Sequence, residues 1–364
     1  MKISIILGTR PEIIKMSPII KECERRGLKY FILHSGQHYT YNMDKIFFEQ
    51  LHLPDAKYNL DTGPGTHAEQ TGKMLIMIET ILKKETPDIV LVEGDTNTVL
   101  AGALAASKLH IKIGHVEAGL RSYDMSMPEE INRILTDHCS NILFAPTNKS
   151  KDILLEENIS EDKIFVTGNT IVDVVYQNLK KATKNSDIFN DLGIERGEYF
   201  LLTLHREENV DDYKRLRKIL YGMKLLSNEF EIPIIYPIHP RTKKMINRFG
   251  FHTNGINLIE PLDYIKFLQL ESYASIILTD SGGVQEEACV LGIPCVTLRE
   301  NTERPETLDV GSNILAGSDP ERILECSKLM LNRDNKWENP FGDGNAGKRI
   351  IDLLNNLWCI NNGN

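Results

Sequence analysis

The chain has 364 residues, a length that suits two domains better than one. Its 41% hydrophobic and 26% charged residues are typical of a soluble globular protein, and its net charge of −9 argues against nucleic acid as a partner, because a phosphate backbone requires clustered Lys and Arg. The six cysteines lack metal-ligand spacing and no apolar run is long enough to cross a membrane, so we expect a cytoplasmic protein without membrane insertion.

Short runs rich in Ile and Val alternate with helical stretches along the chain. In the first half these runs are KISIILG, YFILHSG, DIVLVEGD, IKIGHVEAG, NILFAPT and KIFVTGN. In the second half they are EYFLLTLHRE, IPIIYPIHP, INLIEPL, SIILTDSGG, IPCVTLRE and NILAG. Continuous apolar strands that alternate with helices are typical of parallel sheets covered on both faces. We therefore predict an α/β fold with two doubly wound domains.

The domain boundary is predicted from the segment between the two sets of strands. Residues 175–198 are charged, helical and then turn-like, so we assign residues 1–170 to the first domain and 171–344 to the second. The last stretch, NAGKRIIDLLNNLWCI, has apolar residues at helical spacing, and a helix over about 345–364 can cross back onto the first domain.

Nearly every predicted strand is followed by a small or an ionisable residue. Ligands of open α/β sheets bind at the carboxyl ends of the strands, so these residues predict a cleft between the domains with a charged lining. The stretches are Gly8-Thr9-Arg10-Pro11-Glu12, Gly94-Asp95-Thr96, His115-Val116-Glu117, His205-Arg206-Glu207, His239-Pro240-Arg241, Asp280-Ser281-Gly282-Gly283 and Arg299-Glu300.

The stretch LTDSGGVQEEA predicts a nucleotide ligand. Ser281, Gly282 and Gly283 lie between a strand and a helix, where backbone N–H groups and the helix dipole favour a phosphate, although a tight turn with a serine cap is the alternative. Glu287 follows one helical turn later, where its carboxylate can accept hydrogen bonds from the two hydroxyls of a ribose. We expect the neighbouring Glu286 to lie on a solvated helix face.

Three carboxylates of the first half are less easily explained by binding: Asp95, Glu117 and one of Glu129 and Glu130. Carboxylates that share a cleft suggest acid–base chemistry with shifted pKa values. A Mg²⁺ site is the alternative, although no DxD-type pair occurs at these positions. The cations available for a diphosphate are Arg10, Lys15, His205, Arg206 and Arg304.

Several motifs occur in a recognisable order: GTRPEIIKMSP, EGDTNTVLAG, GHVEAGLRS, MPEEINR, VTGNTIVD, LLTLHREEN, YPIHP, LTDSGGVQEEA and TERPE. Together they closely resemble the non-hydrolysing UDP-N-acetylglucosamine 2-epimerases, from Met1 to about Ile351. The resemblance implies the GT-B architecture, in which two Rossmann-like domains face each other across a cleft and the C-terminal helix packs back onto the first domain. It also implies a homodimer.

The resemblance implies an activity as well. Enzymes of this family interconvert UDP-GlcNAc and UDP-ManNAc by inversion at carbon 2, through elimination of UDP to 2-acetamidoglucal and re-addition. No redox cofactor or metal is expected. The product UDP-ManNAc would serve the synthesis of cell-surface polysaccharide.

The resemblance further assigns roles to single residues. Asp95, Glu117 and Glu129 are the acid–base candidates, with Asp95 favoured as the base. Glu130 stays open as an alternative to Glu129, because the loop before Pro128 looks shorter than in bacterial relatives. The remaining residues are His205 at the diphosphate leaving group, Arg10 and Lys15 at the diphosphate and sugar, Ser281, Gly282 and Gly283 at the phosphates, Glu287 at the ribose, Arg304 nearby and Phe267 beside the uracil.

One segment departs from the family pattern. Bacterial members commonly read Gln-His-Arg-Glu-Met after the second strand, in a segment that helps to hold UDP-GlcNAc as an allosteric activator. Here Tyr39 and Thr40 replace the Arg-Glu pair, while Gln37, His38 and His239 are retained. We hypothesise that allosteric activation is altered or absent.

Other functions agree with parts of the pattern. A GT-B glycosyltransferase would share the fold and the UDP site, a hydrolysing epimerase would release free ManNAc, and a non-catalytic protein would only bind the UDP-sugar. The sugar can also carry further modifications at carbon 3 or carbon 6.

Overall fold

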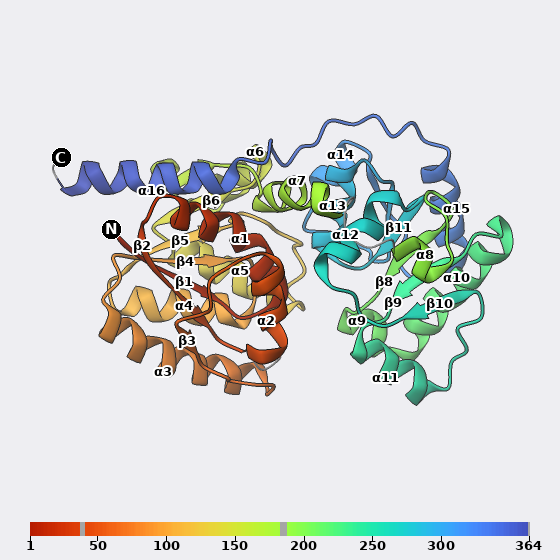
Figure 1. The fold of residues 1–364 in the computed structure, drawn as a ribbon, viewed down its shortest axis with the longest axis horizontal. Helices are drawn as coiled ribbons and strands as arrows, with labels where there is room; N and C mark the ends of the chain where they lie inside the picture. Colours follow the sequence, from red (N-terminus) through yellow and green to blue (C-terminus); the bar gives the residue numbers. More distant parts are fainter. Residues whose placement is uncertain (37–40, 183–187, 363–364) are drawn as a thin grey trace. The chain divides into compact units, whose positions relative to one another are not determined.

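The computed structural model describes residues 1–36, 41–182 and 188–362, and Figure 1 shows the order of its elements. The chain divides into two compact units, which we call unit 1 (Met1–Val174 with Phe341–Asn364) and unit 2 (Val175–Pro340). Each unit is a parallel sheet whose strands alternate with helices, which confirms the predicted α/β class. The segment 37–40, on which the hypothesis about allosteric activation rests, lies outside the described residues.

The described part of unit 1 contains a seven-stranded sheet in the order β3-β2-β1-β4-β5-β6-β7. Its strands are β1 (Lys2–Leu7), β2 (Lys29–His34), β3 (Tyr58–Asn59), β4 (Ile89–Glu93), β5 (Lys112–Val116), β6 (Ile142–Ala145) and β7 (Ile164–Val166). Its helices are α1 (Arg10–Arg25), α2 (Tyr41–Gln50), α3 (His67–Glu85), α4 (Asn97–Lys108), α5 (Pro128–Cys139), α6 (Asn148–Glu156), the short 3₁₀ helix η1 (Glu161–Lys163), the first part of α7 (Thr170–Ala182) and α16 (Ala346–Asn362).

Unit 2, as far as it is described, contains a six-stranded sheet in the order β10-β9-β8-β11-β12-β13. Its strands are β8 (Phe200–Thr203), β9 (Ile234–Pro237), β10 (Ile256–Ile259), β11 (Ile276–Thr279), β12 (Cys295–Thr297) and β13 (Asn313–Leu315). Its helices are the second part of α7, α8 (Ile188–Leu192), α9 (Glu207–Val210), α10 (Tyr213–Phe230), α11 (Pro240–Phe249), α12 (Tyr264–Tyr273), α13 (Gly282–Leu291), α14 (Pro305–Asp309) and α15 (Pro320–Leu331).

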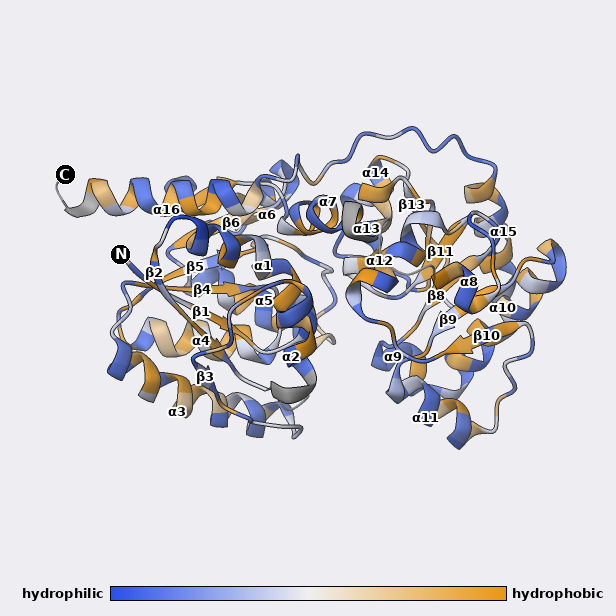
Figure 2. Cartoon of the chain, viewed as in Figure 1, coloured by the Kyte–Doolittle hydropathy of each residue, from blue (hydrophilic) through white to orange (hydrophobic). Residues whose placement is uncertain are grey.

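The strands are apolar because helices cover both faces of each sheet. The adjacent Ile5 and Ile6 of β1 point to opposite faces of the sheet and are both fully buried, and all residues of β4 and β11 are buried. Figure 2 shows the same contrast, with strands largely in the hydrophobic colour and helices that alternate between the two colours.

The C-terminal helix α16 belongs to unit 1. Its first turn is held by Asp173, whose carboxylate accepts hydrogen bonds from the backbone N–H groups of Ala346 and Gly347 at 3.0 Å each. A Cβ atom at Gly347 would lie 2.8 Å from Pro18 of α1, so the glycine permits α16 to approach α1 closely. None of the described helices has the length and apolar character needed to span a bilayer.

Each sheet reverses its winding direction next to its first strand. In unit 1 the reversal lies between β1 and β4, and in unit 2 it lies between β8 and β11. This order is the one found in Rossmann folds, where the ligand crevice opens at the carboxyl ends of the strands on either side of the reversal. The residues that follow β1, β4, β8 and β11 are therefore the first candidates for a functional site.

Candidate active site

The turn after β1 is tied to the turn after β4 by Glu12. Its carboxylate accepts hydrogen bonds from Gly8 N at 2.7 Å, Thr9 Oγ1 at 2.9 Å and Thr96 Oγ1 at 2.6 Å. Burial raises the pKa of Glu12 to about 7, although all three hydrogen bonds oppose the change. Glu12 is therefore a positioning group for both turns. Arg10, predicted to contact the substrate, begins α1, and its Nε lies 3.4 Å from Asp44 Oδ1.

Lys15 projects from α1 into a buried cluster of carboxylates. Its ammonium group pairs with Glu117 and lies 3.7 Å from Glu93 Oε1. Burial raises the pKa of Glu93 well above its usual range, and Glu117 and Glu12 add to this effect while Lys15 opposes it. The uncharged form of Glu93 is therefore favoured beside the Lys15–Glu117 ion pair. The structure brings two of the predicted residues, Lys15 and Glu117, into direct contact.

Asp95 and Glu117 lie at adjacent strand ends because of the strand register. Glu93 of β4 pairs with Val116 of β5, so both candidate carboxylates follow the last paired residues of neighbouring strands. The Asp95 side chain is 27% exposed and forms an ion pair with Arg133 of α5. Asp95 is therefore accessible to a ligand and held by a buried guanidinium.

The structure distinguishes Glu129 from Glu130. Glu130 is buried, and its carboxylate accepts hydrogen bonds from Ser122 N and Oγ at 3.0 Å each and from Tyr123 N at 2.8 Å. It also pairs with Arg133. Glu130 thus fixes the loop before α5, whereas Glu129 in the first turn of α5 is only half-buried.

In unit 2, His205 follows β8 and Asp280 follows β11. Thr203 pairs with Thr279 in the sheet, so the two strands end side by side. The buried Asp280 carboxylate accepts hydrogen bonds from His205 N at 3.0 Å and Arg206 N at 2.9 Å. Burial opposes the charge on Asp280, but His205 and these N–H groups outweigh it and lower the pKa of Asp280 to about 2.

The predicted phosphate turn forms the N-terminus of α13. Ser281 is the N-cap residue, and within the described chain its hydroxyl makes no capping hydrogen bond, so the alternative of a serine-capped turn is not observed. A Cβ atom at Gly282 would lie 2.4 Å from Glu303 Oε1, which explains the need for glycine there. The first N–H groups of a helix have no acceptors within the helix and can bind an anion.

Glu287 lies one turn into α13 and is held by α12. Tyr264 donates a hydrogen bond from its hydroxyl to Glu287 Oε1 at 3.0 Å. The fully buried Glu271 lies on the same helix as Tyr264. Burial and the charge of Glu287 raise the pKa of Glu271 well above its usual range, which favours its uncharged form beside Glu287.

The expectation that Glu286 lies on a solvated face is wrong. Glu286 is fully buried, and its Oε1 lies 2.5 Å from Nε of Arg304, which is also buried. The segment that follows β12 covers this side of α13 and supplies the arginine. The ion pair with Glu286 thereby holds the Arg304 side chain against α13, the helix that begins with Gly282 and Gly283.

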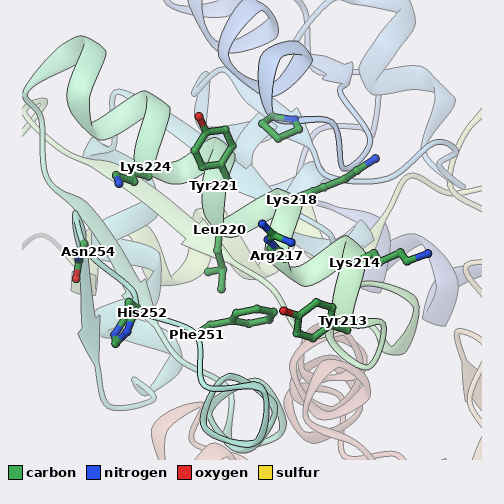
Figure 3. Close-up of a pocket in the computed structure, with 11 residues that line it drawn as sticks. Tyr213, Lys214, Arg217, Lys218, Leu220, Tyr221, Lys224, Phe251, His252 and Asn254 are labelled. Carbon is green, nitrogen blue, oxygen red and sulfur yellow. The ribbon is translucent and has the colours of Figure 1, made fainter.

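Phe267 is half-buried on α12 and packs against an apolar cluster that includes Leu270 and Ile277. A groove of about 730 Å³ lies elsewhere in unit 2, along α10, and no predicted site residue is among its described lining residues (Figure 3). Figure 3 shows Tyr213 and Phe251 at one end of this groove. In the described parts of the chain, no three His, Cys, Asp or Glu side chains are arranged to hold a metal ion.

Sequence reasoning assigned no supporting role to the residues that hold the predicted ones in place. Those described above are Glu12, Glu93, Arg133 and Asp280, of which Glu12 and Asp280 were named only as members of the stretches after the strands. Most of them lie within or beside the recognised motifs, and Asp280 directly precedes Ser281. Their buried partners come from distant parts of the chain, so only the fold reveals what they do.

Comparison with known proteins agrees with this arrangement. The sequence matches the UDP-N-acetylglucosamine 2-epimerase family over residues 21–355. The UDP-N-acetylglucosamine 2-epimerase of Methanocaldococcus jannaschii is 58% identical over 362 residues, which cover 97% of this chain and 99% of that protein. A crystal structure of the M. jannaschii UDP-GlcNAc 2-epimerase in complex with UDP-GlcNAc and UDP has a TM-score of 0.94 and 57% identity, and the match covers 98% of this chain and 99% of that one.

A relative with a different substrate in its name is also similar. The UDP-2,3-diacetamido-2,3-dideoxy-D-glucuronate 2-epimerase of Pseudomonas aeruginosa is 43% identical over 365 residues, which cover 98% of this chain and 100% of that protein. The family match spans most of the chain, and the relatives match it over nearly their full length. This chain belongs to the UDP-N-acetylglucosamine 2-epimerase family.

Proposed function

We propose that this protein is a non-hydrolysing epimerase that interconverts UDP-GlcNAc and UDP-ManNAc. A base removes the proton from carbon 2 while the bond between carbon 1 and the UDP oxygen breaks, which gives 2-acetamidoglucal and UDP. Re-addition of UDP with protonation of carbon 2 on the opposite face completes the inversion. The observation that carries the proposal is the pair Asp95 and Glu117, which lie at adjacent strand ends with different cationic partners.

Unit 1 supplies the acid–base groups in this proposal. Asp95 is the base at carbon 2, because it is the more exposed of the two carboxylates and Arg133 keeps it oriented. Glu117 and Glu129 are the candidates for proton donation on the opposite face. Lys15 and Arg10 contact the sugar and diphosphate, which requires Lys15 to exchange part of its contact with Glu117 for the ligand.

Unit 2 supplies the groups for UDP. Ser281, Gly282 and Gly283 present the N-terminus of α13 to the phosphates, with Arg304 beside them. Glu287 accepts hydrogen bonds from the ribose hydroxyls. The remaining two assignments are His205, which stabilises the diphosphate as it departs, and Phe267, which flanks the uracil from α12.

The finer features of the proposal rest on the motif resemblance. The enzyme acts as a cytoplasmic homodimer without a redox cofactor or metal, and it supplies UDP-ManNAc for cell-surface polysaccharide. A second candidate substrate is a UDP-GlcNAc derivative modified at carbons 3 and 6. The P. aeruginosa relative supports it, although that relative is less similar than the M. jannaschii enzyme.

Proton NMR of the purified protein with UDP-GlcNAc in D₂O tests the proposal. We expect UDP-ManNAc with deuterium at carbon 2, with and without EDTA. Release of free ManNAc and UDP would instead identify a hydrolysing epimerase. A lack of exchange over hours, with UDP binding retained, would reject UDP-GlcNAc as the substrate and move the test to the modified sugar.

A further inference from the structure

His115 has an acceptor at each of its ring nitrogens. It is fully buried on β5, with Nδ1 2.6 Å from Asp137 Oδ1 and Nε2 2.8 Å from the carbonyl oxygen of Gly94. A carbonyl oxygen can only accept a hydrogen bond, so Nε2 carries a proton and donates it to Gly94. The imidazole therefore connects a carboxylate of α5 with the backbone turn that carries Asp95.

Asp137 also holds the turn after β5. Its Oδ2 accepts a hydrogen bond from Gly119 N at 3.2 Å and lies 2.7 Å from Nη1 of Arg121. Burial opposes the charge on Asp137, but His115 and Arg121 outweigh it and lower the pKa of Asp137. A charged carboxylate thus contacts the imidazole with one oxygen and the backbone two residues after Glu117 with the other.

The turn after β5 has a backbone conformation that needs support from its surroundings. Glu117 has φ +69°, whereas the other positive φ angles of the two turns belong to glycines, Gly94 at +82° and Gly119 at +84°. The left-handed region is unfavourable for a residue with a Cβ atom, so Glu117 keeps this conformation only because its neighbours hold it. The Asp137–His115 pair contacts the backbone of both turns and is buried on all sides.

We propose that Asp137 and His115 are positioning residues that set the placement of Asp95 and Glu117 together. The inference rests on the proposed function of these two carboxylates. Neither Asp137 nor His115 contacts substrate in this proposal. They act through the backbone of Gly94 and Gly119, and a misplacement of about 1 Å at a reacting group can lower a rate by roughly 10²-fold.

Two substitutions separate the two hydrogen bonds of the imidazole. In His115→Gln, the side-chain amide nitrogen reaches the position of Nε2 and can still donate to Gly94. In His115→Asn, the shorter amide reaches only the position of Nδ1, so it keeps the contact with Asp137 and loses Gly94. The exposed His110, which precedes β5 and has φ +56°, provides a matched control as His110→Asn, because Asn tolerates the left-handed conformation.

The experiment measures kcat, KM, carbon-2 proton exchange, UDP affinity and thermal stability for each variant. We expect His115→Asn to lower kcat about 10²-fold with KM changed less than about threefold, and His115→Gln to retain about tenfold more activity than His115→Asn. UDP affinity should change less than about threefold, because only Arg10 and Lys15 of the proposed UDP contacts lie in unit 1 and the others lie in unit 2. His110→Asn should behave as wild type.

Hydrogen–deuterium exchange of the backbone provides a readout that does not depend on the activity. His115→Asn should increase exchange in residues 94–97 and His115→Gln should not, whereas Asp137→Asn should increase it in 94–97 and in 117–121. Equal kcat for the Gln and Asn variants, or unchanged exchange in both segments, would overturn the inference. An inactive wild type would reject the proposed function alone, because the exchange measurement would still test the coupling of the two turns.

Discussion

Asp280 Oδ1 lies 3.1 Å from Nδ1 of His205, and the same carboxylate accepts the backbone N–H of His205. The His205 side chain is 42% exposed, while Asp280 is fully buried. Asp280 therefore fixes both the backbone and the ring orientation of a residue that can reach a ligand. An oriented imidazole suits a group beside a departing diphosphate, because one of its ring nitrogens can donate a hydrogen bond to a phosphate oxygen.

Replacing Asp280 by Asn should lower kcat by roughly 10- to 100-fold, because the His205 ring loses the carboxylate that orients it. Steady-state kinetics on UDP-GlcNAc measures the effect. Asp211→Asn is the matched control, since Asp211 pairs with Arg241 at the surface of the same unit and should leave kcat unchanged. A variant at position 280 with wild-type kcat would show that His205 does not need Asp280.

Replacement of Glu287 or Glu271 by Gln should have unequal effects on the affinity for UDP. Glu287→Gln should weaken UDP binding about tenfold or more, because the ribose hydroxyls lose a charged acceptor. Glu271→Gln should change the affinity less than about threefold, since burial raises the pKa of Glu271 and favours its uncharged form, and an amide has a similar shape. Isothermal titration with UDP at pH 7 compares the two variants. Equal losses would mean that Glu271 carries a charge in the protein.

The sequence predicted what local patterns determine. Apolar runs identified the strands of both sheets except β3, which has two residues and therefore no pattern to detect. Motifs placed Asp95, Glu117 and His205 at strand ends, because a strand followed by a turn is a local signal. Glu286 was misjudged because its partner Arg304 is 18 positions away in the sequence and reaches it only through the fold.

The open choice between Glu129 and Glu130 has the same origin. Both residues lie at the start of an apolar helical pattern, and their position in the sequence alone makes them equally good candidates for the acid–base role. The loop residues Ser122 and Tyr123 donate to Glu130 only after the chain has turned back before α5. Burial and hydrogen-bond partners depend on contacts between distant segments, which no local pattern records.

Glu12 predicts a pH dependence of stability in unit 1. Its pKa is raised from 4.5 to about 7 in the folded protein. The folded state therefore binds this proton more tightly than the unfolded state, and the contribution is fully present below pH ~4.5 and lost as pH rises through ~7. We expect the free energy of unfolding of wild type, relative to Glu12→Gln, to fall by about 3 kcal/mol over this window.

Urea denaturation at a series of pH values between ~4.5 and ~8 measures this difference. Glu79→Gln is the control, because Glu79 lies on the surface of α3, where it forms an exposed ion pair with Lys83. The control should show no trend with pH relative to wild type. A constant difference between wild type and Glu12→Gln would mean that Glu12 is ionised throughout the window.

Glu129 and Glu130 are adjacent in the sequence, but the same substitution should affect them differently. Glu130→Gln should destabilise the protein by about 1–3 kcal/mol, because an amide cannot accept all the hydrogen bonds of Ser122, Tyr123 and Arg133. Glu129→Gln should leave the free energy of unfolding nearly unchanged and lower kcat by roughly 10²-fold or more, because a proton-transfer group is lost.

Each variant serves as the control for the other, with urea denaturation and steady-state kinetics applied to both. Activity is compared per folded molecule, so that a loss of stability in Glu130→Gln is not counted as a loss of catalysis. If Glu130→Gln were stable and inactive while Glu129→Gln kept its activity, the catalytic assignment would move to Glu130. Arg133 would then connect two catalytic carboxylates, since it pairs with both Glu130 and Asp95.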